Sequence, residues 1–495
     1  MSSSSSSLIS KTAFLKYDQC PKAFFFYKKH PYLRDPVSKE KQFTFNRGHA
    51  VGKLAQQLFP GGIDVSATAK SSRSAFELTQ QLLNENANTI YEATFIFNDV
   101  LVMVDILHYD GENWMAYEVK SSLKVSDAYI KDACLQYYVL KNSLGKFSDL
   151  FLVTLNANYV LDKEINLKQL FKKRSIKLNA EENFEFFGIT VSKMNLVLER
   201  NMIPDIPIGK QCFSPYSCDF LGTCWKNTED PKSVFRIGKS DREQLFNLYF
   251  SGAETVDKMD MNTDLKPHIK IQAQSILSGQ PYFEKEEVKK FLDKIKGNYC
   301  FMDMEIWSPA IPKYDGTGPF EQIPFLFSIC YLNNGVTDFI NYLKPIDSDS
   351  RLDFLDSVLE ATKKFQSVII FDKNLEQQVL AKLENMFPEK KSEIEILRGK
   401  LVDLSEPIQN FNFFHPKFNG NFSLKAVSEI FGEESDYSGL EITNGIIAMH
   451  KYQELQESEN IINSEQIKQQ LIAYCNIDTL TCMKFLEYLK ENTKD

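Results

Sequence analysis

The chain has 495 residues, of which 43% are hydrophobic and 25% charged, a balance that excludes a wholly disordered protein. Its length predicts several domains. The net charge of −9 argues against a simple basic coat for nucleic acid, but the charge is uneven. Residues 1–235 carry 28 basic and 25 acidic side chains, whereas the remainder carries 29 and 41. Phosphates could still be bound by local basic groups and by cations held on acidic residues.

No uncharged apolar run approaches the ~20 residues that a membrane helix needs. The N-terminal MSSSSSSLISK lacks the apolar stretch of a secretory signal. Nine cysteines are too few for a disulfide scaffold in a chain of this length. We therefore expect a cytoplasmic protein with no membrane partner, whose cysteines are thiols or metal ligands.

The first half of the chain predicts an α/β domain with a mixed sheet flanked by helices. Its strands are rich in β-branched and aromatic residues and are separated by turn formers such as Asn98-Asp99 and Asp110-Gly111. Helices are expected at 8–30, 46–59, 74–87 and 127–142, and strands at 90–97, 100–107, 113–120 and 149–155.

Three polar residues interrupt two of these strands. Asp105 lies near the end of the apolar run VMVDIL, and Glu118 and Lys120 lie two residues apart in AYEVKSS. Side chains two apart on a strand share a face, so Glu118 and Lys120 project together, and Asp105 joins them if the strands pair. Two carboxylates and an ammonium can hold a divalent cation and activate water, which is the chemistry of phosphodiester cleavage. Solvated charges at strand ends are the ordinary alternative.

These stretches resemble the RecB-type nucleases of the PD-(D/E)XK superfamily, including the iron–sulfur exonucleases of CRISPR adaptation modules. The resemblance covers 8–226 and is carried by SKTAFLKYDQCPKAFFF, RGHAVGKLAQ, Asp105, Glu118-Val119-Lys120 and Gln136-Tyr137-Tyr138. It implies a restriction-endonuclease-like fold, with metal on Asp105 and Glu118 and a catalytic set completed by Lys120 and Gln136.

Two positions depart from the pattern of that superfamily. Many relatives carry a metal-binding histidine where this chain has Gly52, and His49 is nearby but out of phase. The usual QxxxY motif ends here in Leu140. The first departure concerns a metal ligand, and the second concerns the catalytic motif that contains Gln136.

A cysteine motif closes this part of the chain. Cys212, Cys218 and Cys224 form a C-x5-C-x5-C run, and Cys20 in DQCPKAFFF is the candidate for a fourth ligand. Four thiolates can bind zinc or a cubane iron–sulfur cluster, and the paired C-x2-4-C spacing common in structural zinc sites is absent. The resemblance implies a [4Fe–4S] cluster on these four cysteines. The other five are expected to be buried as small hydrophobic residues: Cys134, Cys300, Cys330, Cys475 and Cys482.

We place the main domain boundary near residue 235. Residues 1–235 form the first domain, 236–296 a charged helical connector, and 297–495 a second α/β domain. Its strands are expected at 299–306, 325–332, 337–343 and 366–371, and its helices at 351–364, 374–386 and 465–491.

A second acidic group spans this domain. Asp303 and Glu305 share one strand face in NYCFMDMEIW, and Tyr474 and Asp478 share one helix face in LIAYCNIDTLTCMKFLEYL. Two carboxylates on one strand face repel each other unless cations neutralise them. Glu376, at the start of a helix after a strand, is the candidate for a further acid. Two rivals remain for that role: Asp372 and Asp403.

This pattern resembles the DnaQ-like exonucleases, in the subclass with a tyrosine four residues before the last aspartate. The resemblance implies an RNase H-like fold and 3′→5′ exonuclease activity. It implies that Asp303, Glu305 and Asp478 bind two divalent ions, Mg²⁺ or Mn²⁺, with Glu376 and Tyr474 as further catalytic residues. Two such ions stabilise the attacking and leaving oxygens of an in-line displacement, while the tyrosine orients or helps deprotonate the water.

The whole chain, over 8–490, resembles a bacterial family of unknown function that fuses these two domain types. The stretches that carry this resemblance are IPFLFSICYL, FFHPKFNGNFSLKAV and YSGLEITNGIIAMHKYQEL. Within them, we expect His415 and the segment Gly420–Lys425 to form an ordered loop rather than to take part in catalysis.

The leading hypothesis is a metal-dependent DNase with two nuclease centres that act on DNA ends or single strands. DNA repair, defence and CRISPR-linked processing are the pathways that fit it. Three alternatives remain: a nucleic-acid-binding scaffold with decayed centres, a protein in which the second centre alone is active, and an exonuclease directed at RNA. The retention of both sets of acids, with Lys120 and Tyr474, favours an enzyme.

Overall fold

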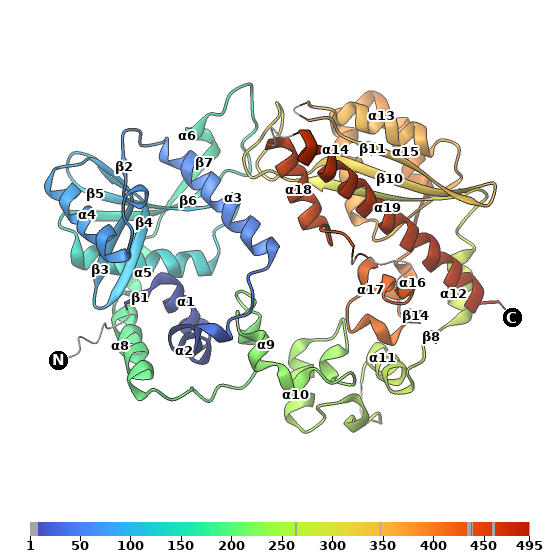
Figure 1. The fold of residues 1–495 in the computed structure, drawn as a ribbon, viewed down its shortest axis with the longest axis horizontal. Helices are drawn as coiled ribbons and strands as arrows, with labels where there is room; N and C mark the ends of the chain where they lie inside the picture. The colour runs from blue at the N-terminus through green and yellow to red at the C-terminus, as the bar shows by residue number, and fades with distance from the viewer. Residues whose placement is uncertain are drawn as a thin grey trace. The chain divides into compact units, whose positions relative to one another are not determined.

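The computed structural model describes residues 8–262, 265–346, 348–432, 437, 439–457 and 461–494. The chain forms two compact units (Figure 1). One consists of Met1–Lys226 with Pro309–Glu321, and the other of Asn227–Ser308 with Gln322–Asp495. Each unit is a mixed α/β structure with its own sheet. Among the described helices, none combines the length and the apolar character needed to cross a bilayer.

The first unit is built on a seven-stranded mixed sheet in the order β2-β3-β4-β5-β6-β7, with β1 added beside β4. β3, β4 and β5 are antiparallel neighbours, whereas β5 and β6 run parallel. The strands are β1 (Ile9–Ser10), β2 (Ile63–Asp64), β3 (Thr89–Phe97), β4 (Val100–Tyr109), β5 (Trp114–Lys120), β6 (Phe147–Leu155) and β7 (Phe171–Ser175).

Helices cover both faces of this sheet, because its strands bury apolar side chains on each side. One face packs against α5, α4 and α8, and the other against α3. The helices are α1 (Lys11–Gln19), α2 (Pro21–Lys29), α3 (Lys39–Gln56), α4 (Ser72–Asn84), α5 (Asp127–Ser143), α6 (Leu167–Leu170), α7 (Lys177–Glu182), α8 (Phe184–Arg200) and α9 (Leu221–Cys224).

The single helix expected over 8–30 is two helices. Cys20 takes an extended conformation, with φ −162° and ψ 113°, between α1 and α2. Pro21 follows it as the first residue of α2. Proline disfavours a helical conformation in the residue before it but suits the first turn of a helix, so the break falls at Cys20.

The regular alternation of side chains between the two faces of the sheet is interrupted where β3 pairs with β4. Ala93 and Val104 pack toward α5, whereas the paired residues Tyr91 and Ile106 pack toward α3. On each strand, two residues that are two positions apart therefore face opposite sides of the sheet, which breaks the usual alternation. Glu92, with φ +55°, is the irregular residue of β3. Irregularities of this kind re-aim a side chain beside a functional site, and here the interruption adjoins Asp105.

The second unit is built on a five-stranded mixed sheet in the order β11-β10-β9-β12-β13. The central strand β9 is antiparallel to β10 and parallel to β12. A separate two-stranded sheet joins β8 (Tyr282–Phe283) to β14 (Phe413–Phe414). The main strands are β9 (Tyr299–Trp307), β10 (Ile323–Asn333), β11 (Val336–Leu343), β12 (Ser367–Ile370) and β13 (Leu401–Asp403).

Helices also cover both faces of this second sheet. α13, α14 and α15 pack on one face, and the long α19 with α17 packs on the other. Figure 1 shows α19 running across the strands. The helices are α10 (Arg242–Phe250), α11 (Pro267–Ser278), α12 (Lys285–Leu292), α13 (Arg351–Thr362), α14 (Asn374–Met386), α15 (Lys391–Lys400), α16 (Glu406–Gln409), α17 (Leu424–Ser428), α18 (Gly445–Glu457) and α19 (Ile461–Asn492).

The division of the chain differs from the expected three segments. The segment 236–296, expected as a connector, belongs to the second unit. There the backbones of Gly238 and Gly420 approach so closely that a Cβ on Gly238 would meet the Gly420 carbonyl oxygen at 2.3 Å. Conversely, 309–321 belongs to the first unit, where Ala310 packs with Val51 of α3. The boundaries between the two units are set by packing between segments that are distant in the sequence, and the amino-acid composition of a segment does not reveal such packing.

Phe14 anchors α1 in the core of the first unit. Its side chain is fully buried and its ring lies 5.6 Å from that of Phe187. We expect Phe14→Ala to lower the free energy of unfolding of this unit by about 3–5 kcal/mol, through lost burial and a residual cavity. The neighbouring Phe186 is 43% exposed, so Phe186→Ala should cost less than about 1 kcal/mol.

This expectation can be checked by chemical denaturation followed by tryptophan fluorescence in a Trp307→Phe background. The remaining tryptophans, Trp114 and Trp225, both lie in the first unit and report its unfolding alone. Equal losses for the two phenylalanine variants would show that α1 is not held by this core.

Candidate metal centres and the cysteine site

The first candidate centre lies where β4 and β5 run side by side beneath α5. Asp105 Oδ2 accepts a hydrogen bond from the backbone N–H of Val119 at 2.6 Å. The Nζ of Lys120 donates to Glu118 Oε1 at 2.7 Å and to Asp132 Oδ2 of α5 at 2.6 Å. Strand pairing thus brings Asp105, Glu118 and Lys120 together on the sheet face that α5 covers.

Lys11 and Asp132 belong to this centre but were not predicted from the sequence, and the same holds for Glu92 of β3. Lys11, the first residue of α1, places its Nζ 2.7 Å from Glu118 Oε1 and 3.5 Å from Asp132 Oδ2. Asp132 is buried on α5, one helical turn before Gln136. The position of Asp132 four residues before Gln136 was a signal in the sequence. Lys11 offered none, because it lies 107 residues from Glu118 along the chain.

Several polar atoms at this centre are buried without a hydrogen-bond partner. They are Glu118 Oε2, Asp132 Oδ1 and both amide atoms of Gln136. Glu118 and Asp132 thus each use one carboxylate oxygen in an ion pair and leave the other free. Buried polar groups normally find partners, so unpartnered carboxylate oxygens fit a site for a divalent cation.

The carboxyl groups of this centre differ in their affinity for protons. Burial, helped by the charge of Glu118, raises the pKa of Asp105 to about 8. Burial, again with Glu118, raises the pKa of Glu92 to about 7. Burial also disfavours ionised Glu118, but Lys11 and Lys120 outweigh it and hold the pKa of Glu118 at about 2. Asp105 and Glu92 are therefore the groups that a bound cation would help to ionise.

The residues at which the chain departs from the family pattern make other contacts or none. His49 of α3 is exposed, and a Cβ added at Gly52 would meet no atom within 4 Å. Tyr137 donates its hydroxyl to Glu181 at 3.1 Å, while the ring of Tyr138 packs against Phe184. Both tyrosines therefore support the helices behind α5.

The four cysteines of the predicted cysteine site line one small cavity. Cys20, Cys212, Cys218 and Cys224 surround it together with residues of α2 and of the loop before Cys212. Burial raises the pKa of the Cys218 thiol to about 11, and Cys212 and Cys20 add to this effect. The aromatic rings of Phe25, Phe26 and Phe220 shield the site. Cysteines nearly 200 residues apart are thus brought to one place. Four thiols that line one shielded cavity are the ligand set of either a zinc ion or a cubane iron–sulfur cluster.

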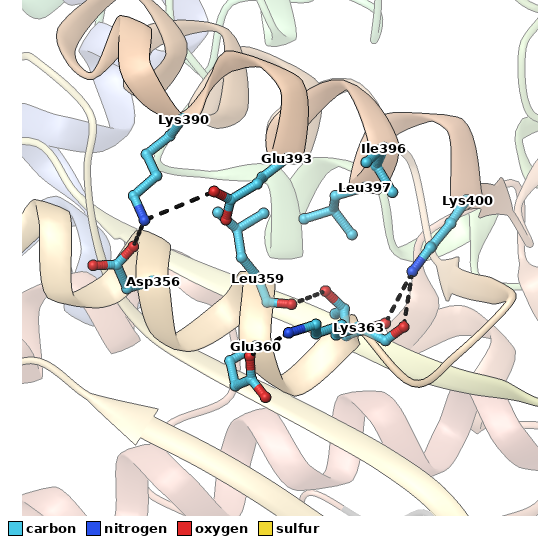
Figure 2. A pocket seen from close by; sticks show the side chains of 10 residues that line it. Asp356, Leu359, Glu360, Lys363, Lys390, Glu393, Ile396, Leu397 and Lys400 are labelled. Atoms are coloured by element: carbon cyan, nitrogen blue, oxygen red, sulfur yellow. Dashed lines mark hydrogen bonds and ion pairs between the residues drawn. The ribbon is translucent and has the colours of Figure 1, made fainter.

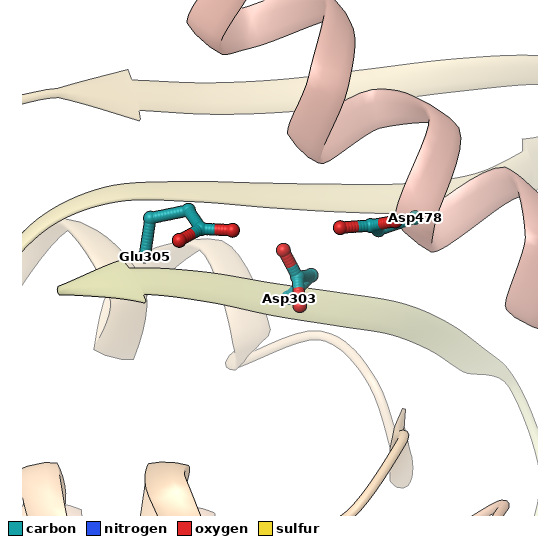
Figure 3. A group of neighbouring side chains, drawn as sticks. All are labelled: Asp303, Glu305 and Asp478. Carbon is teal, nitrogen blue, oxygen red and sulfur yellow. The ribbon is translucent and has the colours of Figure 1, made fainter. Parts of the chain in front are cut away.

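The second candidate centre lies between β9 and α19 (Figure 3). Asp303 and Glu305 point from the face of β9 that α19 covers, and Asp478 points toward them from α19. One ligand oxygen from each lies within 4.8 Å of the others. Polar contacts fix the helix here, because Ser328 Oγ of β10 donates to Asn476 Oδ1 at 2.7 Å. This convergence fits one or more divalent cations.

Of the three candidates for a further acid, Glu376 has the burial that suits the role. It lies in the first turn of α14, is 3% exposed, and leaves its Oε2 without a hydrogen-bond partner. Asp372 is exposed and accepts hydrogen bonds from Asn374. Asp403 accepts backbone N–H groups of Asp372 and Ser405 at 3.0 and 2.9 Å, so it shapes the turn between β12 and α14.

Burial raises the pKa of every acid in this second centre. The pKa of Asp303 rises to about 6 and that of Glu376 to about 8, the latter helped by the charge of Asp303. The pKa values of Glu305 and Asp478 rise well above their usual range, because burial is reinforced by neighbouring carboxylates. No lysine or arginine pairs with these four acids, among the ion pairs of the described residues.

Two tyrosines adjoin Asp478. Tyr474 lies one turn before it on α19, and burial together with Asp478 raises the pKa of Tyr474 far above its usual value. Tyr437, which sequence reasoning missed, donates its hydroxyl to Asp478. Both phenols stay protonated at neutral pH, so they act as hydrogen-bond donors at this acid rather than as bases.

Two further contacts of this centre were not foreseen. Cys475 is buried as expected, but its Sγ also donates to Asp303 Oδ2 at 3.0 Å. Gly445, at the start of α18, lies so near Glu305 that a Cβ there would meet Oε2 at 3.3 Å.

His415 lies in the expected loop, where its Nδ1 accepts the N–H of Lys417 and burial lowers its pKa to about 4.

A groove lies between α13 and α15 in the second unit (Figure 2). Its lysines already have partners: Lys390 pairs with Asp356 at 2.6 Å, and Lys400 Nζ donates to carbonyl oxygens at the end of α13. The groove thus offers no unpartnered charge to a ligand, and we do not assign it a function.

Comparison with known families adds one finding. Residues 300–423 match the family model of a domain of unknown function, DUF2779. The match begins on β9, includes Asp303, Glu305 and Glu376, and ends before Tyr437 and α19. No match was found among curated proteins.

The raised pKa values predict how the stability of the second unit depends on pH. The folded, metal-free chain keeps a proton on Glu376 up to about pH 8, whereas an ordinary glutamate releases it near 4.5. Within this window folding takes up a proton, so stability falls as pH rises. We expect the melting temperature in EDTA to fall between about pH 5 and pH 8, and Glu376→Gln to flatten this fall.

Glu360→Gln is the matched control, because Glu360 is a largely exposed carboxylate on α13. Scanning calorimetry across this pH range should show the wild-type slope for Glu360→Gln. A Glu376→Gln slope equal to that of the wild type would contradict the assignment of Glu376 to a buried, uncompensated position.

Proposed function

We propose that the protein is a metal-dependent nuclease with two hydrolytic centres, one in each unit, and that its substrate is DNA. The observation that carries this proposal is the convergence of Asp303, Glu305 and Asp478 within 4.8 Å of one another. These acids come from a central strand and from a helix more than 170 residues later. Buried carboxylates without a positive partner are costly unless cations neutralise them.

The second centre supports 3′→5′ exonuclease chemistry in an RNase H-like domain. Two divalent ions, Mg²⁺ or Mn²⁺, would be held by Asp303, Glu305 and Asp478, with Glu376 beside them, and would stabilise an in-line displacement at phosphorus. Tyr474 keeps its proton and donates a hydrogen bond, so its proposed role is to orient the water or a phosphate oxygen. The DUF2779 match includes three of these acids and gives this region no function of its own.

The first centre supports cleavage of the PD-(D/E)XK type. Asp105 and the free Oε2 of Glu118 would hold one divalent ion, which activates water. Lys120 is held between Glu118 and Asp132, so its ammonium can stabilise the charge that develops on a phosphate. Gln136 presents an unpartnered amide from α5 that can bind the water or the substrate.

The cysteine site supports a [4Fe–4S] cluster rather than zinc. The four cysteines line a cavity shielded by aromatic rings, and their C-x5-C-x5-C spacing lacks the close pairs common in structural zinc sites. The cluster would join the C-terminal end of α1 to the segment from Cys212 to the end of α9. Such a bond closes a loop of nearly 200 residues and thereby stabilises the unit.

A nucleic-acid-binding scaffold is the second candidate function. The observation that favours it is the absence of a histidine from position 52 of α3, where many relatives bind metal. The two proposals differ in cleavage and not in DNA binding. RNA remains an alternative substrate for the second centre.

Single substitutions should separate the two centres. Asp105→Ala and Asp303→Ala each remove one metal-binding carboxylate, so each should lower its own reaction by at least about 100-fold. On end-labelled single- and double-stranded DNA with Mn²⁺, we expect each variant to lose a different part of the product ladder. EDTA should abolish all cleavage.

Exposed acids provide the controls for this experiment: Glu77→Ala in the first unit and Asp353→Ala in the second should keep the wild-type ladder. Retention of the full ladder by both active-centre variants would refute the two-centre proposal. DNA binding without cleavage, with either metal, would support the scaffold instead. Faster degradation of RNA than of DNA would reassign the substrate.

The cysteine site has its own test in anaerobically purified protein. We expect about four iron atoms per chain and a visible absorbance band, both lost in Cys20→Ser, with a melting temperature lower by several degrees. Cys134→Ala, which changes a cysteine packed in the apolar core, should keep the iron. Stoichiometric zinc in place of iron would overturn the cluster assignment.

A further inference from the structure

Lys11 gives the first centre a second ammonium group. Its Nζ and that of Lys120 each lie 2.7 Å from the same atom, Glu118 Oε1. Lys11 also lies 3.5 Å from Asp132 Oδ2, and Lys120 lies 2.6 Å from it. Two ammonium groups on one carboxylate oxygen leave Glu118 Oε2 buried and free. The lysine pair therefore decides which oxygen of Glu118 can face a cation.

Lys11 supplies one of the two ammonium groups that face three acids: Asp105, Glu118 and Asp132. Removing Lys11 would leave these carboxylates with a single ammonium group, that of Lys120. Because the cluster is largely buried, a unit of charge there is felt strongly by any bound cation.

Helix α1 is held at both of its ends, which fixes the position of Lys11. At the N-terminal end, Ile9 donates its N–H to the carbonyl of Asp99, and Ser10 caps the helix. Near the other end, Lys16 pairs with Asp219 at 2.6 Å, and Cys20 of the cysteine site follows directly. Lys11 is therefore a fixed charge on an anchored helix rather than a mobile surface lysine.

We propose that Lys11 is a positioning residue of the first centre, where it orients Glu118 toward the divalent cation and supplies a fixed positive charge beside it. This inference rests on the proposed metal-dependent cleavage at that centre. The role predicts a particular signature, because the charge of Lys11 repels the cation while its hydrogen bonds orient the ligand. Loss of Lys11 should therefore tighten metal binding and slow cleavage at the same time.

The test uses full-length, chelator-treated protein with an intact cysteine site, in an Asp303→Ala background that removes a ligand of the second centre. Mn²⁺ affinity is measured by titration with electron paramagnetic resonance, and cleavage is measured on end-labelled DNA. For Lys11→Met we expect Mn²⁺ to bind about tenfold more tightly. We expect cleavage to fall roughly 100-fold, because Glu118 loses its orientation.

Two matched variants make the test specific. Lys11→Arg keeps the charge and should restore the Mn²⁺ affinity to within about threefold of the parent protein, with part of the cleavage. Lys131→Met breaks a different α1–α5 ion pair, the 2.8 Å contact with Asp18, and should change neither quantity by more than about threefold.

The outcomes separate this inference from the proposed function. Weaker Mn²⁺ binding together with slower cleavage in Lys11→Met would indicate a merely structural lysine and overturn the inference, as would no change in either. If Asp105→Ala in the same background does not reduce Mn²⁺ binding, the first centre holds no metal and both proposals fail. Tighter Mn²⁺ binding with slower cleavage, reversed by Lys11→Arg, supports the inference.

Discussion

Burial of like charge is the constraint on which both candidate centres depend. A carboxylate removed from water must be protonated, paired or bound to a cation, because the interior screens its charge poorly. The first unit pairs its acids with Lys11 and Lys120, so Glu118 stays ionised. Among the described residues of the second unit, no lysine or arginine pairs with the acids, and their pKa values rise together. The two centres therefore accommodate buried carboxyl groups in different ways, the first by ion pairs with lysines and the second by raised pKa values.

This difference has consequences for the proposed chemistry. A centre that contains its own ammonium groups needs less charge from metal ions, whereas a centre of four unpaired acids needs more. The second centre also surrounds its acids with donors, since Tyr437 and Cys475 contact Asp478 and Asp303. Those donors hold the carboxylates in place, which suits a site that must accept ions in a fixed geometry.

The sheets explain why these residues meet. In each unit the acids lie on a strand whose neighbours are fixed by ladder hydrogen bonds, and one long helix covers that face. In the first unit, the alternation of side chains on β3 and β4 is interrupted at Glu92, beside Asp105. The interruption disturbs regular pairing and changes the direction in which the side chains point. The helices then add what the strands lack: Asp132 and Gln136 from α5, and Asp478 from α19.

The sequence by itself determined the elements and the residues whose signal is local. Strand and helix periods placed Glu118 beside Lys120, Asp303 beside Glu305 and Tyr474 beside Asp478, because each pair lies within one turn or one pleat. Tertiary structure decided the rest. Lys11 reaches Glu118 across 107 residues and Tyr437 reaches Asp478 across 41, and no period relates such positions. The same reason explains why 236–296 joined the second unit: long-range packing, rather than local composition, sets a domain boundary.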